Sequence, residues 1–177
     1  MRRPVLILAV AMCGAAAVAQ TPDAAKVCLA QIRNQTATKF ELPKLGKTFL
    51  ANLQSTKLAK DGSVTLVPIE ANNSDDGKAE VEKAGCEFAI YTRILRKPKD
   101  DTRTLETGTT YEVSKHEDIP VEIYGLQCTV ERTSSGMPIL IDRQFDSRPT
   151  AGDRGVLKLL AAEASRIEEA LGKKIKK

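Results

Sequence analysis

Hydrophobic and polar positions in the first half of the chain alternate between two rhythms. Three short apolar runs, at 26–34 (KVCLAQIRN), 64–69 (VTLVPI) and 87–95 (EFAIYTRIL), favour buried strands. Between the first two, a repeat at helical spacing follows Pro43 and ends near Gln54. Between the last two, residues 74–83 begin with a Ser-Asp-Asp cap and lead to Gly85, which suits a left-handed stop. The order is β-α-β-α-β.

From residue 109 onward the rhythm becomes a two-residue alternation with no helices between. It predicts strands at 111–113, 120–132 and 138–146, and the sequence Ser134-Ser135-Gly136 predicts a hairpin turn joining the last two. A closing helix begins at Asp153 and stops at Gly172. Its apolar stripe is expected at Val156, Leu157, Leu160, Ala164, Ile167 and Leu171. Its solvent side is expected at Lys158, Glu163, Arg166, Glu168 and Glu169.

These elements predict an α/β fold with a mixed sheet covered by helices: β-α-β-α-β, then an antiparallel β-meander and a C-terminal helix. Helical crossovers make their flanking strands parallel, whereas hairpins reverse the chain. We expect the first strand to lie between the second and the third. The predicted organisation is one domain over 26–172, preceded by a polar segment at 20–25 and followed by a basic tail at 173–177.

Residues 1–19 are typical of a signal peptide. Arg2 and Arg3 precede an uncharged run from Val5 to Ala19 that ends in the small-x-small pattern Ala17-Val18-Ala19. The run is shorter than the roughly 20 apolar residues of a membrane span. We therefore expect cleavage before Gln20, and a periplasmic or secreted protein without stable membrane insertion. Acylation of Cys13 is the alternative, but Met12 is not the small residue that usually precedes an acylated cysteine.

Charge and composition exclude nucleic acid as a partner. The chain of 177 residues has 27 Lys and Arg against 23 Asp and Glu, a net charge of +4. Removing Arg2 and Arg3 with the leader lowers this to 25 − 23 = +2. Nucleic-acid binders carry a concentrated basic face, and single-strand binders add stacked aromatic rings. Only 4% of this chain is aromatic.

Export leaves three cysteines, so one internal disulfide and one free thiol are expected. Cys28 and Cys86 are the first candidate pair, because both are expected at the starts of neighbouring strands. A bridge from Cys86 to Cys128 is the alternative. None of the three has metal-ligand spacing, and the single histidine, His116, lies in a charged stretch and is interpreted as solvated.

The succession of elements resembles the periplasmic α/β domain of bacterial envelope proteins. The segment that carries most of this likeness is 84–91 (AGCEFAIY), at the start of the third strand, and the likeness extends over most of 26–172. Members include the CsgG-type curli secretion lipoprotein, the lipoprotein activators of penicillin-binding proteins and the amino-terminal domain of TolB. The resemblance implies a non-enzymatic domain that works by contact with other proteins. Membrane-inserting hairpins like those of the secretion channel are not recognisable here.

The sequence contains no motif of a hydrolase, zinc protease, P-loop or dinucleotide-binding enzyme, and it indicates no cofactor. We expect a non-enzymatic interaction or assembly module whose partner is another cell-envelope protein. Its oligomeric state is not indicated. The candidate interaction surface is a sheet edge together with the charged loop 96–108, which a plain solvated connector would also explain. The loop's charged residues are Arg96, Lys97, Lys99, Asp100, Asp101 and Arg103. The alternative function is binding of a small molecule or glycan.

Overall fold

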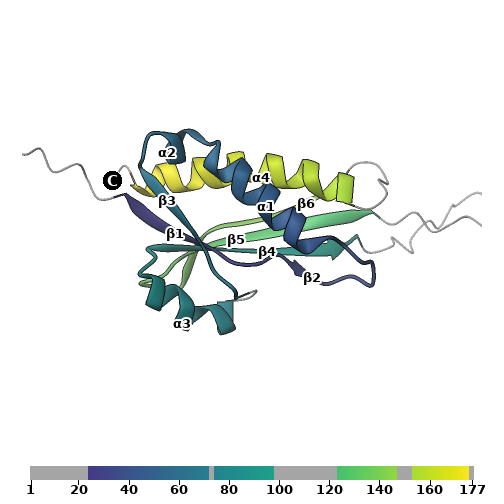
Figure 1. Ribbon diagram of the computed structural model, residues 1–177, viewed down its shortest axis with the longest axis horizontal. Helices are drawn as coiled ribbons and strands as arrows, with labels where there is room; N and C mark the ends of the chain where they lie inside the picture. Colours follow the sequence, from purple (N-terminus) through teal and green to yellow (C-terminus); the bar gives the residue numbers. More distant parts are fainter. Residues whose placement is uncertain (1–23, 72–73, 98–122, 147–152, 176–177) are drawn as a thin grey trace, which may run out of the picture.

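The computed structural model describes residues 24–71, 74–97, 123–146 and 153–175. Its strands form one mixed sheet in the order β3-β1-β4-β5-β6, with a short β2 beside β4 (Figure 1). The strands are β1 (Ala25–Leu29), β2 (Arg33–Asn34), β3 (Val64–Pro68), β4 (Phe88–Arg96), β5 (Tyr124–Arg132) and β6 (Met137–Phe145). The helices are α1 (Leu42–Gln54), α2 (Lys57–Lys60), α3 (Ser74–Ala84) and α4 (Asp153–Ile175). The predicted fold class is confirmed.

The parallel half of the sheet has the predicted strand order. β1 pairs in parallel with β3 on one side and with β4 on the other, so the first strand lies between the second and third of the predicted order. Gly85 ends α3 with a φ of +66°, the left-handed conformation that glycine adopts without steric cost. The short α2 between α1 and β3 was not predicted.

The first predicted strand, 26–34, is in fact two strands. Leu29 is paired with Ile90, but Arg33 is paired with Arg93, so four residues of this segment run beside three of β4. One extra residue reverses which face each following side chain occupies. Ile32 therefore joins the core with Leu29, and Arg33 is turned to the opposite face.

The antiparallel half is the β5–β6 hairpin that the alternation predicts. β5 pairs along its whole length with β4, and β6 pairs with β5. The turn contains Gly136 at a φ of +62°, and the Gly136 N–H donates to the Arg132 carbonyl oxygen at 2.9 Å. A bulge in β6 near its start places Pro138 opposite Glu131 and Leu140 opposite Val130.

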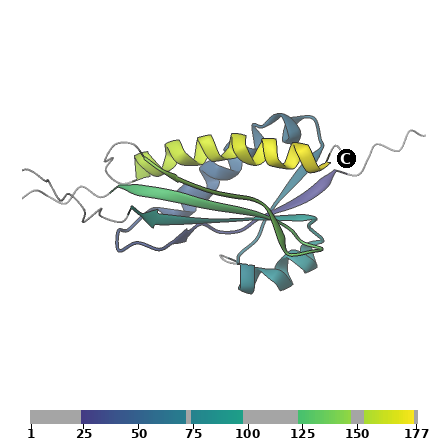
Figure 2. The same ribbon diagram turned by 180° about the vertical axis from the view of Figure 1, so that it is seen from behind.

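The helices lie in two layers. α1 and α4 pack together on one face of the sheet and enclose the main core, which includes Phe49, Phe88 and Ile167 (Figure 1). On the other face α3 covers the parallel strands, and Val81 packs against Cys28 and Ala89. Of the described elements, none covers this second face over β2, β5, β6 and the far half of β4 (Figure 2). We call this region the open face.

Two expectations for the closing helix are wrong. α4 continues through Gly172 to Ile175, and its last turn carries Lys173, whose Nζ lies 2.7 Å from Glu169 Oε1. Lysines in the last turn complement the helix dipole, which favours this extension. Glu163, expected on the solvent side, is buried with 1% of its surface exposed.

Several predicted features lie outside the described residues. They are the signal peptide, Cys13, the strand at 111–113 and His116.

Candidate functional site

The predicted interaction loop leaves the sheet at the end of β4. Arg96 and Lys97 are exposed there, and the Lys97 N–H donates to the Ile123 carbonyl oxygen at 2.8 Å, so residues 97 and 123 lie side by side at the end of the sheet. Lys99, Asp100, Asp101 and Arg103 lie outside the described residues. The structure therefore brings the first two candidate residues to the end of the sheet where β6 also ends.

The disulfide joins Cys28 to Cys86, whose Cα atoms are 5.7 Å apart. It ties β1 to the segment that opens β4, beneath α3. Cys28 is the fourth residue of β1, so the expectation that it lies at the start of its strand is wrong. Cys128 is a buried free thiol. Burial, and after it the negative charge of Glu163, raises the pKa of this thiol well above its usual range. Such a thiol is unreactive.

The outer strand β6 forms one edge of the sheet. Its two most exposed apolar residues are Met137 (67% exposed) and Ile141 (63%), the large hydrophobic side chains that the described part of the chain leaves most open. The Asp146 N–H donates to the Tyr124 carbonyl oxygen at 3.1 Å, and this bond identifies which residue pairs of the β5–β6 ladder are hydrogen-bonded. Antiparallel ladders alternate bonded and non-bonded pairs, so the N–H and C=O groups of Ile141, Arg143 and Phe145 point outward from the sheet.

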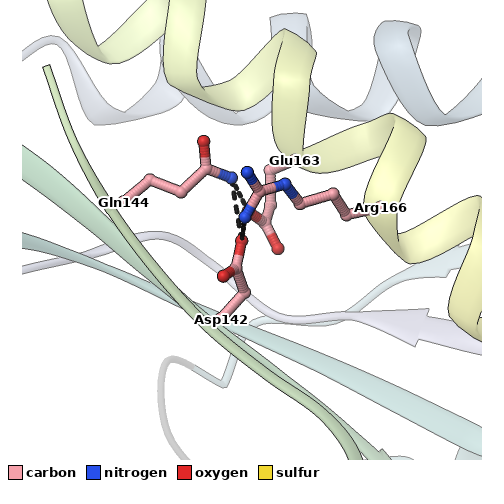
Figure 3. A network of polar contacts seen from close by, with 4 residues as sticks. All are labelled: Asp142, Gln144, Glu163 and Arg166. Atoms are coloured by element: carbon pink, nitrogen blue, oxygen red, sulfur yellow. Dashed lines mark hydrogen bonds and ion pairs between the residues drawn. The ribbon is translucent and has the colours of Figure 1, made fainter. Parts of the chain in front are cut away.

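A polar network on the other face of β6 connects the strand to α4 (Figure 3). Asp142 and Gln144 project from β6 toward Glu163 and Arg166 of α4. Gln144 Nε2 donates to Glu163 Oε2 at 2.6 Å and to Asp142 Oδ2 at 2.9 Å. Arg166 Nη1 forms an ion pair with Asp142 Oδ2. The network fixes the alternate residues of the edge strand to the body of the protein.

Glu163 is the unusual member of this network. Burial, and after it the hydrogen bond and charge of Asp142, raise the pKa of Glu163 from 4.5 to about 7. Its Oε1 atom is buried without a hydrogen-bond partner in the described structure. The pKa of Asp142 is lowered, because hydrogen bonds from Gln144, Glu163 and Arg166 outweigh the opposing effect of burial. The pair therefore has one proton to share near neutral pH.

The buried position of Glu163 could have been found in the sequence. It follows Val156 and Leu160 and precedes Ile167 at spacings of four, three and four, which is the periodicity of a buried helix face. Its charge placed it on the solvent side instead. The partners on β6 could not be identified, because alternating polar residues on an edge strand ordinarily face water.

A separate apolar cavity of about 410 Å³ lies where β1 and β3 end beneath the start of α1. Its lining includes Leu29, Ile32, Leu50 and Ile69, and Lys47 is its single charged residue. Ligands of α/β sheets commonly bind beyond the carboxyl ends of parallel strands. The cavity has the position of such a site, but few of the polar groups that would orient a glycan.

Within the described ranges, no cluster of three or more His, Cys, Asp or Glu residues could hold a metal ion. None of the described helices combines the length and apolar character needed to cross a bilayer.

Comparison with known proteins finds similarity in structure alone. No protein-family model and no curated protein sequence matches the chain. A PelC dodecamer from Paraburkholderia phytofirmans is 12% identical in sequence. The match covers 84% of this chain and 88% of that chain, at a TM-score of 0.48. The LpoB C-terminal domain from Salmonella enterica is 12% identical, with coverages of 73% and 87% and a TM-score of 0.45. TolB from Acinetobacter baumannii is 8% identical, and the match covers 85% of this chain and 28% of that chain, at a TM-score of 0.44.

TolB, which the resemblance in the sequence also names, is among these structures. A specific likeness to the CsgG-type lipoprotein is not established. At these identities and TM-scores the comparisons carry no statement about the family or the activity of this chain.

Proposed function

We propose that this protein is an exported, non-enzymatic component of the bacterial envelope that binds another envelope protein by accepting one of its strands at β6. The observation that carries the proposal is the outer strand itself. Its N–H and C=O groups at Ile141, Arg143 and Phe145 point away from the sheet, and Ile141 is 63% exposed. Addition of a strand to such an edge satisfies these groups and covers the apolar side chain.

The two edges of the sheet differ in a way that favours β6. The opposite edge, β3, has five residues, ends in Pro68 and contacts both α1 and α2. Short length, proline and covering helices are the devices that protect an edge from other chains. β6 has nine residues, and its proline and bulge are confined to the start. The regular stretch from Leu140 to Phe145 remains open to a partner.

A rigid edge favours binding, because less conformational entropy is lost on association. The inward-facing residues Asp142 and Gln144 are fixed to α4 by the polar network, while the outward-facing residues alternate with them. The polar network therefore holds β6 in place and leaves free the outward N–H and C=O groups of Ile141, Arg143 and Phe145, which a partner strand would need.

The assignment to the envelope is supported by the leader and by the cysteines. Residues 1–19 have the pattern of a cleavable signal peptide. A bridge between Cys28 and Cys86 is stable in the oxidising compartment to which such a peptide leads. A non-catalytic role agrees with the lack of enzyme motifs in the sequence.

The charged loop 96–108 is proposed as a second part of the same surface. Arg96 and Lys97 begin it at the end of the sheet where Phe145 ends β6. A partner strand seated on β6 would pass close to the start of this loop.

The decisive variants for the edge are Ile141→Pro and Ile141→Ala. Proline at this position removes an N–H that points outward, so the β5–β6 hydrogen bonds are kept while strand addition is blocked. Alanine removes the same side chain but keeps the N–H. The mature protein is immobilised and exposed to an envelope extract of the producing bacterium, and bound proteins are identified by mass spectrometry. We expect a partner that the wild type and the alanine variant retain and the proline variant does not. Equal retention by the proline variant would contradict the proposal.

The apolar cavity supports a second candidate function, the binding of an apolar small molecule. Gly46 of α1 lines it, and a side chain at this position would meet no atom within 4 Å of its Cβ. Gly46→Leu should therefore fill the cavity without disturbing the helix. Loss of fluorescence enhancement of 1-anilinonaphthalene-8-sulfonate in this variant, with enhancement retained in Gly172→Ala on α4 outside the cavity, would support the candidate. Equal enhancement in both would contradict it.

A further inference from the structure

Four residues on neighbouring strands form a row across the open face. Arg33 of β2 is paired with Arg93 of β4, Arg93 with Gln127 of β5, and Gln127 with Arg143 of β6. Partners in a ladder project to the same face of a sheet, and adjacent strands are about 4.8 Å apart. Three guanidinium groups and one amide therefore line up. We call Arg33, Arg93, Gln127 and Arg143 the arginine row.

The stability of the fold does not explain this row. All three arginines are exposed, and none takes part in an ion pair within the described ranges. Arg33 and Arg93 are direct cross-strand partners, and like charges in that position destabilise a sheet. The extra residue between β1 and β2 brings Arg33 to this face, since regular pairing would have turned it toward the core. The row is a local cluster of three positive charges that a carboxylate would neutralise.

Arg143 connects the row to the proposed binding edge. Its guanidinium lies 5.1 Å from the centre of the Phe145 ring, close enough for a cation–π contact that orients it. The Phe145 ring in turn occupies the space beside Gly125, where an added Cβ would lie 2.4 Å from a ring carbon. Ile141, Arg143 and Phe145 thus present apolar, cationic and apolar side chains in succession along the open face of the outer strand.

We infer that the partner strand is acidic: it places a carboxylate opposite Arg143, between apolar side chains opposite Ile141 and Phe145. This inference rests on the proposed function and adds the chemistry of the partner to it. Cross-strand pairs of opposite charge and of apolar residues are the stabilising combinations in an antiparallel sheet. The arginine row would then attract further carboxylates of the same acidic segment.

The same geometry disfavours a second copy of this chain as the partner. If two β6 strands pair antiparallel so that Ile141 of one faces Phe145 of the other, Arg143 of each copy stands opposite Arg143 of the other. Like charges directly opposite destabilise the pairing. The arginine therefore protects the edge from self-association and leaves it open to an acidic strand.

Two capped peptides test the inference on the whole mature protein. Ser-Val-Ser-Glu-Ser-Val-Ser places valine, glutamate and valine on one face when extended, and the control peptide has lysine in place of glutamate. Binding is followed by the shifts of the β6 amide resonances during titration. We expect the glutamate peptide to bind about fivefold more tightly than the lysine peptide at low salt, with the difference shrinking as salt is added. Arg143→Glu should reverse the preference, and the matched variant Arg154→Glu on α4 should leave it unchanged.

Each other outcome has a distinct meaning. Equal affinity for the two peptides overturns the inference of an acidic partner. If Ile141→Pro then abolishes the binding of both peptides, strand addition at β6 is still supported. Binding of the glutamate peptide that survives Ile141→Pro contradicts the proposed edge function. No shift of β6 resonances at millimolar peptide overturns the inference. Polygalacturonate, an acidic polysaccharide, is tested in parallel. If it binds while neither peptide does, and if the double variant Arg93→Glu, Arg143→Glu weakens its binding, the ligand is an acidic glycan and the inference of an acidic strand is overturned.

Discussion

Replacing the buried carboxyl group by an amide, in Glu163→Gln, should remove a dependence of stability on pH. The pKa of Glu163 is raised from 4.5 to about 7 in the folded protein, first by burial and then by Asp142. The folded state therefore binds more protons than the unfolded chain between these two values. Stability from this group is fully present below pH 4.5 and is lost as pH rises to about 7. Glutamine mimics the protonated carboxyl group at every pH.

The magnitude follows from the size of the shift. Each pKa unit corresponds to about 1.4 kcal/mol, so the change from 4.5 to about 7 amounts to about 3 kcal/mol. Asp142 acts in a different range, because its lowered pKa adds stability above its ordinary value of 3.8 that is lost only in acid. Between pH 4.5 and 7 the slope therefore belongs to Glu163. At alkaline pH the glutamine variant should be the more stable protein by up to about 3 kcal/mol.

Urea unfolding of the oxidised protein, measured at a series of pH values, provides the assay. The free energy of unfolding of the wild type should fall as pH rises from 4.5 to about 7 and level off above that, and that of Glu163→Gln should stay nearly level over the same range. Glu169→Gln is the control, since Glu169 is exposed and paired with Lys173. A wild-type stability that is constant or rising over this range, or a glutamine variant less stable than the wild type in alkali, would refute the reasoning.

Three further predictions concern the bridge, the loop and the edge strand. Peptide mapping without reduction should recover Cys28 linked to Cys86, and recovery of alkylated Cys28 would show the pairing to be wrong. Replacing both cysteines by serine should lower the free energy of unfolding by about 4 kcal/mol, as the sequence separation of 58 residues implies. Deleting residues 98–105 should leave the thermal midpoint almost unchanged and weaken retention of the partner, and full retention would make the loop a connector. Gly125→Ala should displace the Phe145 ring and the Gln144 carbonyl group, lowering stability by about 1–3 kcal/mol in urea unfolding and weakening partner binding. A variant as stable as the wild type would contradict this close approach.

The order of the strands could be predicted because it depends on local patterns and chirality. Short apolar runs separated by amphipathic segments define the parallel half, and right-handed crossovers leave few arrangements of the strands. The turn at Ser134-Ser135-Gly136 likewise follows from residue chemistry at the hairpin.

The candidate site could be predicted only in outline. The extra residue between Leu29 and Arg33 leaves no recognisable signal in the segment 30–32 (AQI), yet it decides that Arg33 faces away from the core. The arginine row depends on the register of four strands that are far apart in the sequence. The helical spacing of Glu163 indicates a buried position, but its partner Gln144 on β6 is known only from tertiary contacts.

Amide hydrogen exchange of β6, with and without the retained partner, tests the central claim most directly. In the free protein the outward N–H groups of Ile141, Arg143 and Phe145 should exchange rapidly, whereas the inward groups of Asp142 and Gln144 should be protected. Strand addition should slow the outward amides in the complex and leave α1 and α3 unchanged. Slowed exchange elsewhere, with the three outward amides of β6 still exchanging rapidly in the complex, would contradict the account.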